Sequence, residues 1–160
     1  MKIEEVNLTK DNLIKIEEID NTFYKNDITG IDWYLQRYNE NHKAVLLFDN
    51  DKCVGYCVYV PIKKELYEAL VNGVLINDVN INPKMYINES EYNYVVSSVI
   101  LKEYRGKGYA TLMIERLLKN KTGKFVALTI SNDGYKLASK FMDFKLKISN
   151  EINVFVKELW

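Results

Sequence analysis

The residues best suited to chemistry lie in one short segment, Tyr104-Arg105-Gly106-Lys107-Gly108-Tyr109-Ala110. Gly106 and Gly108 allow a tight turn and a close approach of the backbone to a ligand. A helix that starts directly after them offers N–H groups without an internal partner, at the positive end of its dipole. Arg105 and Lys107 add positive charge at the same end, where the helix dipole alone does not favour it. The segment therefore predicts a site for an anion such as a pyrophosphate.

The turn needs a strand before it and a helix after it. Tyr94 to Leu101 is an apolar run, apart from Ser97 and Ser98, and is typical of a central strand covered on both faces. Lys119 to Lys121, before Gly123, mark the end of the helix. Its apolar residues recur at helical spacing: Ala110, Met113, Ile114 and Leu117.

The remaining elements predict a mixed α/β fold. In chain order we expect a strand, two helices, three strands, a helix, a strand, a helix and two strands, which favours a sheet with helices on both faces and strands that are not all parallel. Within residues 62–90 only Leu66 to Val71 suggests a short helix, and 79–83 looks irregular. The other expected elements are Ile3–Leu8, a helix from Thr9-Lys10-Asp11, Ile31–Tyr38, Ala44–Phe48, Cys53–Pro61, Phe125–Ile130, Gly134–Phe141, Lys145–Ile148 and Ile152–Leu159.

Length and composition exclude several classes of protein. The chain has 160 residues, 48% of them hydrophobic and only two prolines, which predicts one compact domain over residues 1–160. Its 22 basic residues balance 22 acidic ones and only three are arginine, so a nucleic-acid partner is not expected. No apolar run approaches the ~20 residues of a membrane span, and the amino terminus has no signal-peptide core. We expect a soluble, cytoplasmic protein.

The cysteines and the histidine do not suggest a metal or redox site. Cys53 and Cys57 lie on one face of a strand but about 13 Å apart at ~3.3 Å per residue, too far for a disulfide. We interpret them as reduced core residues. His42, the single histidine, lies in a polar stretch that reads as an exposed loop. No metal is expected.

With its flanks, the glycine turn resembles the acyl-CoA-binding motif of the GNAT family of N-acetyltransferases. The family pattern is Gln or Arg, two residues, Gly, one residue, then Gly or Ala, and it is met by Arg105, Gly108 and Ala110. A second family motif, a strand, a helix that begins with Asn and a closing aromatic residue, is matched by residues 126–130, Asn132 and Phe144. A Rossmann site fits poorly because Thr111 stands at the third glycine position. The structural alternative is a glycine turn that only caps a helix.

The resemblance implies a GNAT-like, mostly antiparallel sheet and acetyl-CoA as co-substrate. By resemblance, the cofactor lies between the splayed ends of the strands Tyr94–Leu101 and Phe125–Ile130, with its pantetheine arm paired to strand backbone and its pyrophosphate held by N–H groups of the turn. Asn132 would contact the pantetheine or help to place the acceptor, and an N-cap role for it is equally open. The implied cofactor-binding residues are Ser98, Val99, Ile100, Arg105, Gly106, Lys107, Gly108, Tyr109, Ala110, Thr111 and Asn132.

The chain departs from the family at two positions that handle protons. The family often places a tyrosine seven residues after the helix-starting Asn, as the acid for the departing thiolate, and that position is Ser139 here. A glutamate found in the central strand of some members falls near Ser97. Ser139 is our candidate thiolate partner, as a hydrogen-bond donor or through water. The N–H of Ile100 is the candidate for polarising the thioester carbonyl.

Other residues complete the expected chemistry. Asp78, Glu89 and Glu91 are candidate bases, with a water relay and a purely solvated role as alternatives, and Tyr92, Tyr94 and Tyr135 could donate a proton. Trp33, Tyr34 and Tyr38 could line an acceptor pocket or simply pack on the sheet. Two functions remain open: acetyl transfer from acetyl-CoA to a small-molecule or peptide amine, and a non-catalytic acyl-CoA-binding or sensing module of the same fold. Either is compatible with a homodimer.

Overall fold

The computed structural model describes residues 1–23, 30–74 and 80–160. They form two compact units, residues 1–58 with 97–119 and residues 59–96 with 120–160. The division falls within two strands, β3 (Lys52–Pro61) and β4 (Tyr92–Ile100). Seven strands are hydrogen-bonded in the order β1-β2-β3-β4-β5-β7-β6. β4 and β5 are parallel, whereas β1–β2, β5–β7 and β6–β7 are antiparallel, so the predicted mixed sheet is confirmed.

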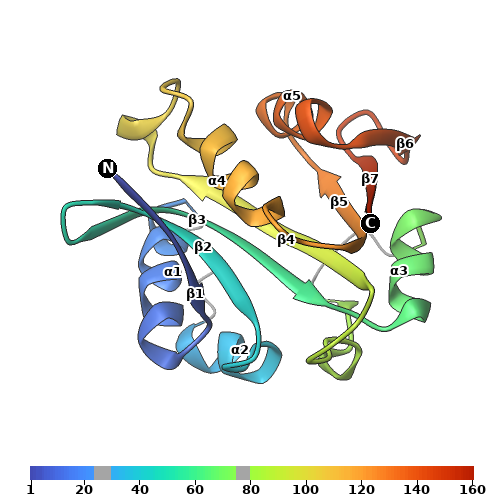
Figure 1. The fold of residues 1–160 in the computed structure, drawn as a ribbon, viewed down its shortest axis with the longest axis horizontal. Coiled ribbons are helices and arrows are strands. Elements are labelled where there is room, and N and C mark those ends of the chain that lie inside the picture. Colours follow the sequence, from blue (N-terminus) through green and yellow to red (C-terminus); the bar gives the residue numbers. More distant parts are fainter. Residues whose placement is uncertain (24–29, 75–79) are drawn as a thin grey trace. The chain divides into compact units, whose positions relative to one another are not determined.

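The elements follow one another as expected, with one helix more clearly defined than the sequence indicates. That helix, α3, begins at Lys64, two residues before the expected Leu66. The other helices are α1 (Lys10–Phe23), α2 (Gly30–Arg37), α4 (Tyr109–Leu118) and α5 (Asn132–Phe141), with short 3-10 turns η2 (Pro83–Met85) and η3 (Lys102–Tyr104). The remaining strands are β1 (Lys2–Asn7), β2 (Lys43–Asp49), β5 (Gly123–Thr129), β6 (Asp143–Lys147) and β7 (Asn153–Leu159), and α3 is Lys64–Val71 (Figure 1).

In the first unit, helices cover both faces of the strands. Glu5 of β1 is paired with Val45 of β2, and Arg116 of α4 reaches Glu5 across 3.9 Å, which places α4 on that face. Gly55 of β3 belongs to the same face, because a Cβ on it would lie 3.4 Å from the Cβ of Leu47. The next residue of β3, Tyr56, points to the opposite face, where its hydroxyl donates to Asp20 of α1. With helices on both faces, residues Ala44 to Leu47 are fully buried.

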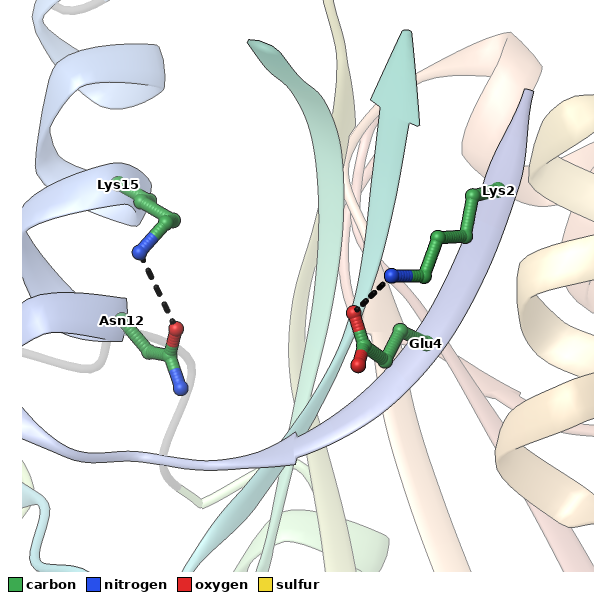
Figure 2. Close-up of polar contacts among 4 residues, drawn as sticks. All are labelled: Lys2, Glu4, Asn12 and Lys15. Carbon is green, nitrogen blue, oxygen red and sulfur yellow. Dashed lines mark hydrogen bonds and ion pairs between the residues drawn. The ribbon is translucent and has the colours of Figure 1, made fainter. Parts of the chain in front are cut away.

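The junction between β1 and α1 is fixed by side-chain hydrogen bonds. The backbone N–H of Asn12 donates to Thr9 Oγ1 (3.3 Å), which caps the helix as the sequence predicts. The Asn12 side chain donates to the carbonyl oxygen of Asn7 (2.8 Å) and accepts from Lys15 Nζ (3.5 Å; Figure 2). Figure 2 also shows the ion pair between Lys2 and Glu4 on β1, at 3.3 Å. Both of these side chains are exposed, so the pair contributes little stability.

In the second unit, α3 and α5 pack on β5 and β7. The β4–β5 ladder runs from Tyr92–Lys124 to Val95–Ala127, and β4 then continues to Ile100. An aromatic cluster joins α5 to the sheet: the ring of Phe155 lies edge-on to Tyr135 (5.2 Å between centroids) and to Phe144 (5.9 Å). The buried residues of this unit include Leu66, Leu70, Phe125, Val126, Val154 and Phe155.

Two expectations about burial are wrong. His42 is not an exposed loop residue, since only 1% of it is accessible. The polar segment folds back on β1, where the carbonyl oxygen of His42 accepts from Leu8 N (2.9 Å) and its Nδ1 accepts from Asn39 N (3.3 Å). The β4 strand is also not covered along its whole length: Tyr94 and Ile100 are buried, but Ser98 is exposed.

Candidate functional site

The turn between β4 and α4 is held by three hydrogen bonds. Arg105 Nε donates to the carbonyl oxygen of Ile100 (2.8 Å), and the N–H of Tyr104 donates to the carbonyl oxygen of Leu101 (2.9 Å). The hydroxyl of Tyr104 donates to Asp49 Oδ2 (2.7 Å), which ties the turn to the end of β2. This hydrogen bond raises the pKa of Tyr104. These bonds therefore tie the turn to the ends of β2 and β4.

The two glycines of the turn adopt backbone conformations that favour glycine. Gly106 has φ of 74° and Gly108, the N-cap of α4, has φ of 85° and ψ of 3°. Among the described residues, no atom outside the adjoining ones lies within 4 Å of where a Cβ would be at either position. The first helical hydrogen bond joins Leu112 N to the carbonyl oxygen of Gly108, so the N–H groups of Tyr109 and Ala110 have no acceptor within the helix. The turn presents backbone donors beside open space.

Two positive charges flank these donors. Arg105 and Lys107 are exposed, and within the part of the chain that the structure describes neither forms a salt bridge. The Arg105 guanidinium lies over the ring of Phe23 at the end of α1, 4.7 Å from its centroid. Apart from the bond from Nε, the guanidinium makes no hydrogen bond to the described residues, so none of them occupies its outer N–H groups. The electrostatics of the turn favour an anion, as the sequence predicts.

The end of β4 has its backbone closely packed on one side. Ser98 is exposed, Val99 is half-buried and Ile100 is buried. On the β3 side, a Cβ at Gly55 would come within 3.1 Å of Ile100 Cγ1 and 3.2 Å of the carbonyl oxygen of Val99. The absence of a side chain at Gly55 thus lets β3 approach the strand that precedes the turn.

A hydrogen-bonded cluster lies on the α1 face of the first unit. Asp20 of α1 accepts from the hydroxyl of Tyr34 of α2 at Oδ2 and from the hydroxyl of Tyr56 of β3 at Oδ1, both at 2.5 Å. The Tyr56 hydroxyl also lies 3.2 Å from Ser97 Oγ of β4. Burial raises the pKa of Asp20, and the two tyrosine donors oppose the rise. Burial, and then the charge of Asp20, hold the pKa of Tyr56 well above its usual value.

Sequence reasoning missed Asp20 and Tyr56. The signal for Asp20 is its place in the apolar stripe of α1: it is four residues after Ile16 and seven after Leu13, both of which are buried. A carboxylate at such a position needs hydrogen-bond partners. The partners lie 14 and 36 residues away in the chain, so the sequence does not identify them.

In the second unit, Asn132 is not the N-cap of α5, which was one of the two roles expected for it. The cap is Ser131, whose Oγ accepts from Gly134 N (3.0 Å), and Asn132 is the first helical residue. Asn132 is exposed, and its side chain has no hydrogen bond to the described residues. Ser139 is also exposed, and its Oγ donates to the carbonyl oxygen of Tyr135 one turn earlier (2.7 Å).

The structure describes all but one of the other candidate bases and acids. Asp78 lies outside the described residues, and Glu89 and Glu91 are exposed. Tyr92 stacks with Tyr67, at 5.0 Å between ring centroids, and Tyr94 is buried.

The aromatic residues of α2 do not form one wall. Trp33 lies edge-on to Tyr34 and carries the Arg37 guanidinium 4.4 Å above its ring. Tyr34 is bonded to Asp20, and Tyr38 packs against His42. Of the three, Trp33 is the least buried.

Both cysteines are free thiols, as predicted. Burial raises the pKa of Cys57 to about 12. Cys53 is half-buried and lines an open groove of about 630 Å³, together with Lys15 and Glu18 of α1.

Among the described residues there is no group of three or more His, Cys, Asp or Glu that could hold a metal ion. None of the described helices is both long and apolar enough to cross a bilayer.

Comparison with known proteins places these features in context. The model of the acetyltransferase (GNAT) family matches residues 11–134. An acetyltransferase from Thermus thermophilus has a similar structure, with a TM-score of 0.65 at 12% identity over 99% of this chain and 98% of that one. Arabidopsis thaliana NAA60 in complex with acetyl-CoA has a TM-score of 0.61 at 13% identity, over 99% of this chain and 100% of that one. Arabidopsis thaliana Naa50, in complex with the bisubstrate analogue CoA-Ac-MVNAL, has a TM-score of 0.60 at 16% identity with the same coverage. A comparison with curated protein sequences found no match.

Proposed function

Because the chain belongs to the acetyltransferase (GNAT) family, we propose that it transfers an acetyl group from acetyl-CoA to a primary amine by direct attack in a ternary complex. The observation that carries the proposal is the turn Arg105 to Gly108, which presents backbone N–H groups and two positive charges without a salt bridge to the described residues at the start of α4. A pyrophosphate is the ligand that this arrangement suits. Similar structures were solved with acetyl-CoA or a CoA-containing analogue, which supports this ligand.

We assign the cofactor to two sets of residues. Arg105, Lys107 and the backbone N–H groups of residues 106–111 bind the pyrophosphate. The backbone of residues 98–100 pairs with the pantetheine arm, and the continuation of β4 beyond its four-pair ladder with β5 supports this part of the proposal. Asn132, whose side chain is exposed at the start of α5, contacts the pantetheine or the acceptor.

The reaction needs few protein groups. The lone pair of a neutral amine attacks the thioester carbonyl carbon, and an N–C bond forms. The C–S bond breaks, the sulfur leaves with its electron pair, and the proton that the nitrogen loses passes to this thiolate to give the free thiol of CoA. Binding both substrates in register makes this step effectively unimolecular. In our proposal the N–H of Ile100 polarises the carbonyl, and Ser139 donates a hydrogen bond to the thiolate after releasing the carbonyl of Tyr135.

The cellular location and the acceptor are proposed from two further observations. Two free thiols support a reducing, cytoplasmic location. The peptide analogue bound by Naa50 makes a peptide amino terminus one acceptor to test, beside small amines. A homodimer stays a prediction, as does a single domain over the whole chain.

Acetyl-CoA binding and thiol release test this function together. We expect calorimetry to show binding of acetyl-CoA, and a thiol reagent to show release of CoA with at least one acceptor from a panel of polyamines, aromatic amines and the peptide Met-Val-Asn-Ala-Leu. Binding without thiol release from any acceptor favours the non-catalytic acyl-CoA-binding module. Absence of binding contradicts both functions.

A further inference from the structure

The direction of the hydrogen bonds around Tyr56 is fixed by its single proton. An ionised Asp20 can only accept, so the proton of Tyr56 points to Asp20 Oδ1. In the contact between Tyr56 and Ser97, the donor must then be Ser97 Oγ. The three groups therefore form a directed chain, from the Ser97 hydroxyl through the Tyr56 hydroxyl to the Asp20 carboxylate. The lone pairs of Ser97 Oγ are left to accept a proton from a further donor.

The chain starts on the strand that leads to the turn. Ser97 is three residues before Ile100, about 10 Å along an extended strand at ~3.3 Å per residue, and directly precedes residues 98–100, which we assign to the pantetheine arm. Ser97 is half-buried, whereas 2% of Tyr56 is accessible. The chain thus connects a partly accessible oxygen to a carboxylate behind it, with no water needed between them.

We propose that Asp20 accepts, through Tyr56 and Ser97, the proton that the acceptor ammonium must lose before it can attack acetyl-CoA. This inference rests on the proposed function and supplies the base that β4 lacks. The ammonium N–H bond breaks and its proton moves to Ser97 Oγ, the proton of Ser97 moves to Tyr56 Oη, and the proton of Tyr56 moves to Asp20 Oδ1. The amine keeps its electron pair, both hydroxyls end neutral, and Asp20 ends as a neutral acid.

The surroundings of Asp20 suit a proton acceptor. Among the described residues, the groups that face it are Tyr34 from α2 and Tyr56 from β3, and none of the described lysines, arginines or histidines pairs with it. A cation at this position would hold the carboxylate ionised and weaken it as a base. Burial has the opposite effect and raises its pKa, which brings a carboxylate closer to the range of an effective base.

Four variants separate this relay from a purely structural cluster. Asp20→Asn keeps the shape but removes the proton acceptor, Tyr56→Phe and Ser97→Ala interrupt the chain, and Tyr34→Phe is the matched control, since Tyr34 contacts Asp20 but lies outside the path. With the best acceptor of the panel, we expect Asp20→Asn and Tyr56→Phe to lower kcat/KM about 100-fold or more at neutral pH. We expect Tyr34→Phe, which leaves the proton path intact, to lower kcat/KM far less than these two variants, and all four variants to keep the affinity for acetyl-CoA within about twofold.

The pH profile provides the readout that a structural role would not change. The decrease in kcat/KM caused by Asp20→Asn should become smaller as the pH rises toward the pKa of the acceptor amine, because a neutral amine needs no base. Tyr34→Phe removes a donor that lowers the pKa of Asp20, so the acidic limb of kcat/KM should move to higher pH. Should Asp20→Asn unfold, Tyr56→Phe gives the same test.

The inference is overturned if Asp20→Asn and Ser97→Ala both keep kcat/KM within about threefold, or if their losses are the same at every pH. These results differ from failure of the proposed function, in which the unmodified protein itself binds no acetyl-CoA or releases no thiol. A carbon-13 titration of the Asp20 carboxyl is independent of activity: a pKa that does not rise in Tyr34→Phe also contradicts the inference.

Discussion

Arg105 Nε donates a hydrogen bond to the carbonyl oxygen of Ile100 across 2.8 Å. This bond joins the last residue of β4 to the first residue of the glycine turn, while the ring of Phe23 supports the guanidinium from one side. One side chain therefore shapes the turn and also brings a positive charge to it. The two contributions can be separated by substitution, because lysine keeps the charge and loses the planar N–H group.

We expect Arg105→Ala to weaken acetyl-CoA binding about tenfold or more, equivalent to ~1.4 kcal/mol, because it removes both the charge and the bond to Ile100. Arg105→Lys should fall between Arg105→Ala and the unmodified protein. Calorimetry at two salt concentrations provides the measurement. Lys107→Ala is the control for charge alone, since no hydrogen bond of its side chain to the described residues shapes the turn, and an equal effect of the two alanine variants would contradict a shaping role for Arg105.

Gly108→Glu should abolish detectable acetyl-CoA binding while the protein stays folded. The Cβ of the new side chain meets no atom of the described part of the chain, but the side chain brings a carboxylate to the place that we assign to the pyrophosphate. Gly108→Ala controls for the backbone, whose left-handed conformation costs an L-residue roughly 1–2 kcal/mol. Binding by Gly108→Glu that equals binding by Gly108→Ala would mean that no anion sits at the turn.

The raised pKa of Asp20 predicts a pH dependence of stability. The folded protein holds the Asp20 proton more tightly than the unfolded chain, so this residue contributes stability below its unfolded pKa of about 3.8, which is lost as the pH rises through its folded pKa. The free energy of unfolding of Asp20→Asn, measured with urea, should therefore rise relative to that of the unmodified protein between pH 4 and neutral pH. A difference that falls over this range would show that the carboxylate is stabilised rather than destabilised by its surroundings.

The thiols should differ in reactivity. Because burial raises the pKa of Cys57 to about 12 and encloses its sulfur, we expect iodoacetamide to leave Cys57 unmodified in the folded protein at neutral pH. Cys53 is half-buried beside an open groove, so it should react first. Peptide mapping by mass spectrometry gives both rates, and unfolding in urea is the control that should make them similar.

Two substitutions of Ser139 should change kcat in opposite directions. Its hydroxyl bonds only to its own helix among the described residues, so Ser139→Ala should leave the fold intact and lower kcat only a few-fold, with no change in acetyl-CoA affinity. Ser139→Tyr supplies the more acidic phenol, and since the position is exposed there is room for it. We expect this variant to raise kcat under single-turnover conditions. A lower kcat in Ser139→Tyr would argue against a thiolate at this position.

The fold could be predicted from local patterns because each element has its own signal. Residues 104–110 combine glycines, charges and a following helical repeat, and the β2–β3 hairpin has two β-rich runs around a polar turn, in which Asn50 has φ of 52°. The exact ends of the helices and strands were harder to predict. Ser131 rather than Asn132 caps α5, because either residue type can accept from the third N–H and only the backbone conformation decides between them.

The Asp20 cluster could not be predicted, for a different physical reason. Its hydrogen bonds join α1, α2, β3 and β4, and a hydrogen bond between residues 36 or 41 positions apart depends on how the elements pack. The same holds for His42, whose polar neighbours suggest solvent but whose carbonyl completes the pairing at the end of β1. The polarity of the neighbouring residues in the sequence indicates whether a segment can be exposed to water. The burial of Asp20 and His42 depends instead on the elements that pack over them.

The open space around Gly108 bears on which residues could replace it. An L-residue is disfavoured there by its left-handed backbone conformation, since no atom of the residues that the structure describes would meet the added carbon. A mirror-image residue such as D-alanine, introduced by chemical synthesis, adopts the left-handed conformation without that cost. The backbone at this position therefore selects for the handedness of the residue.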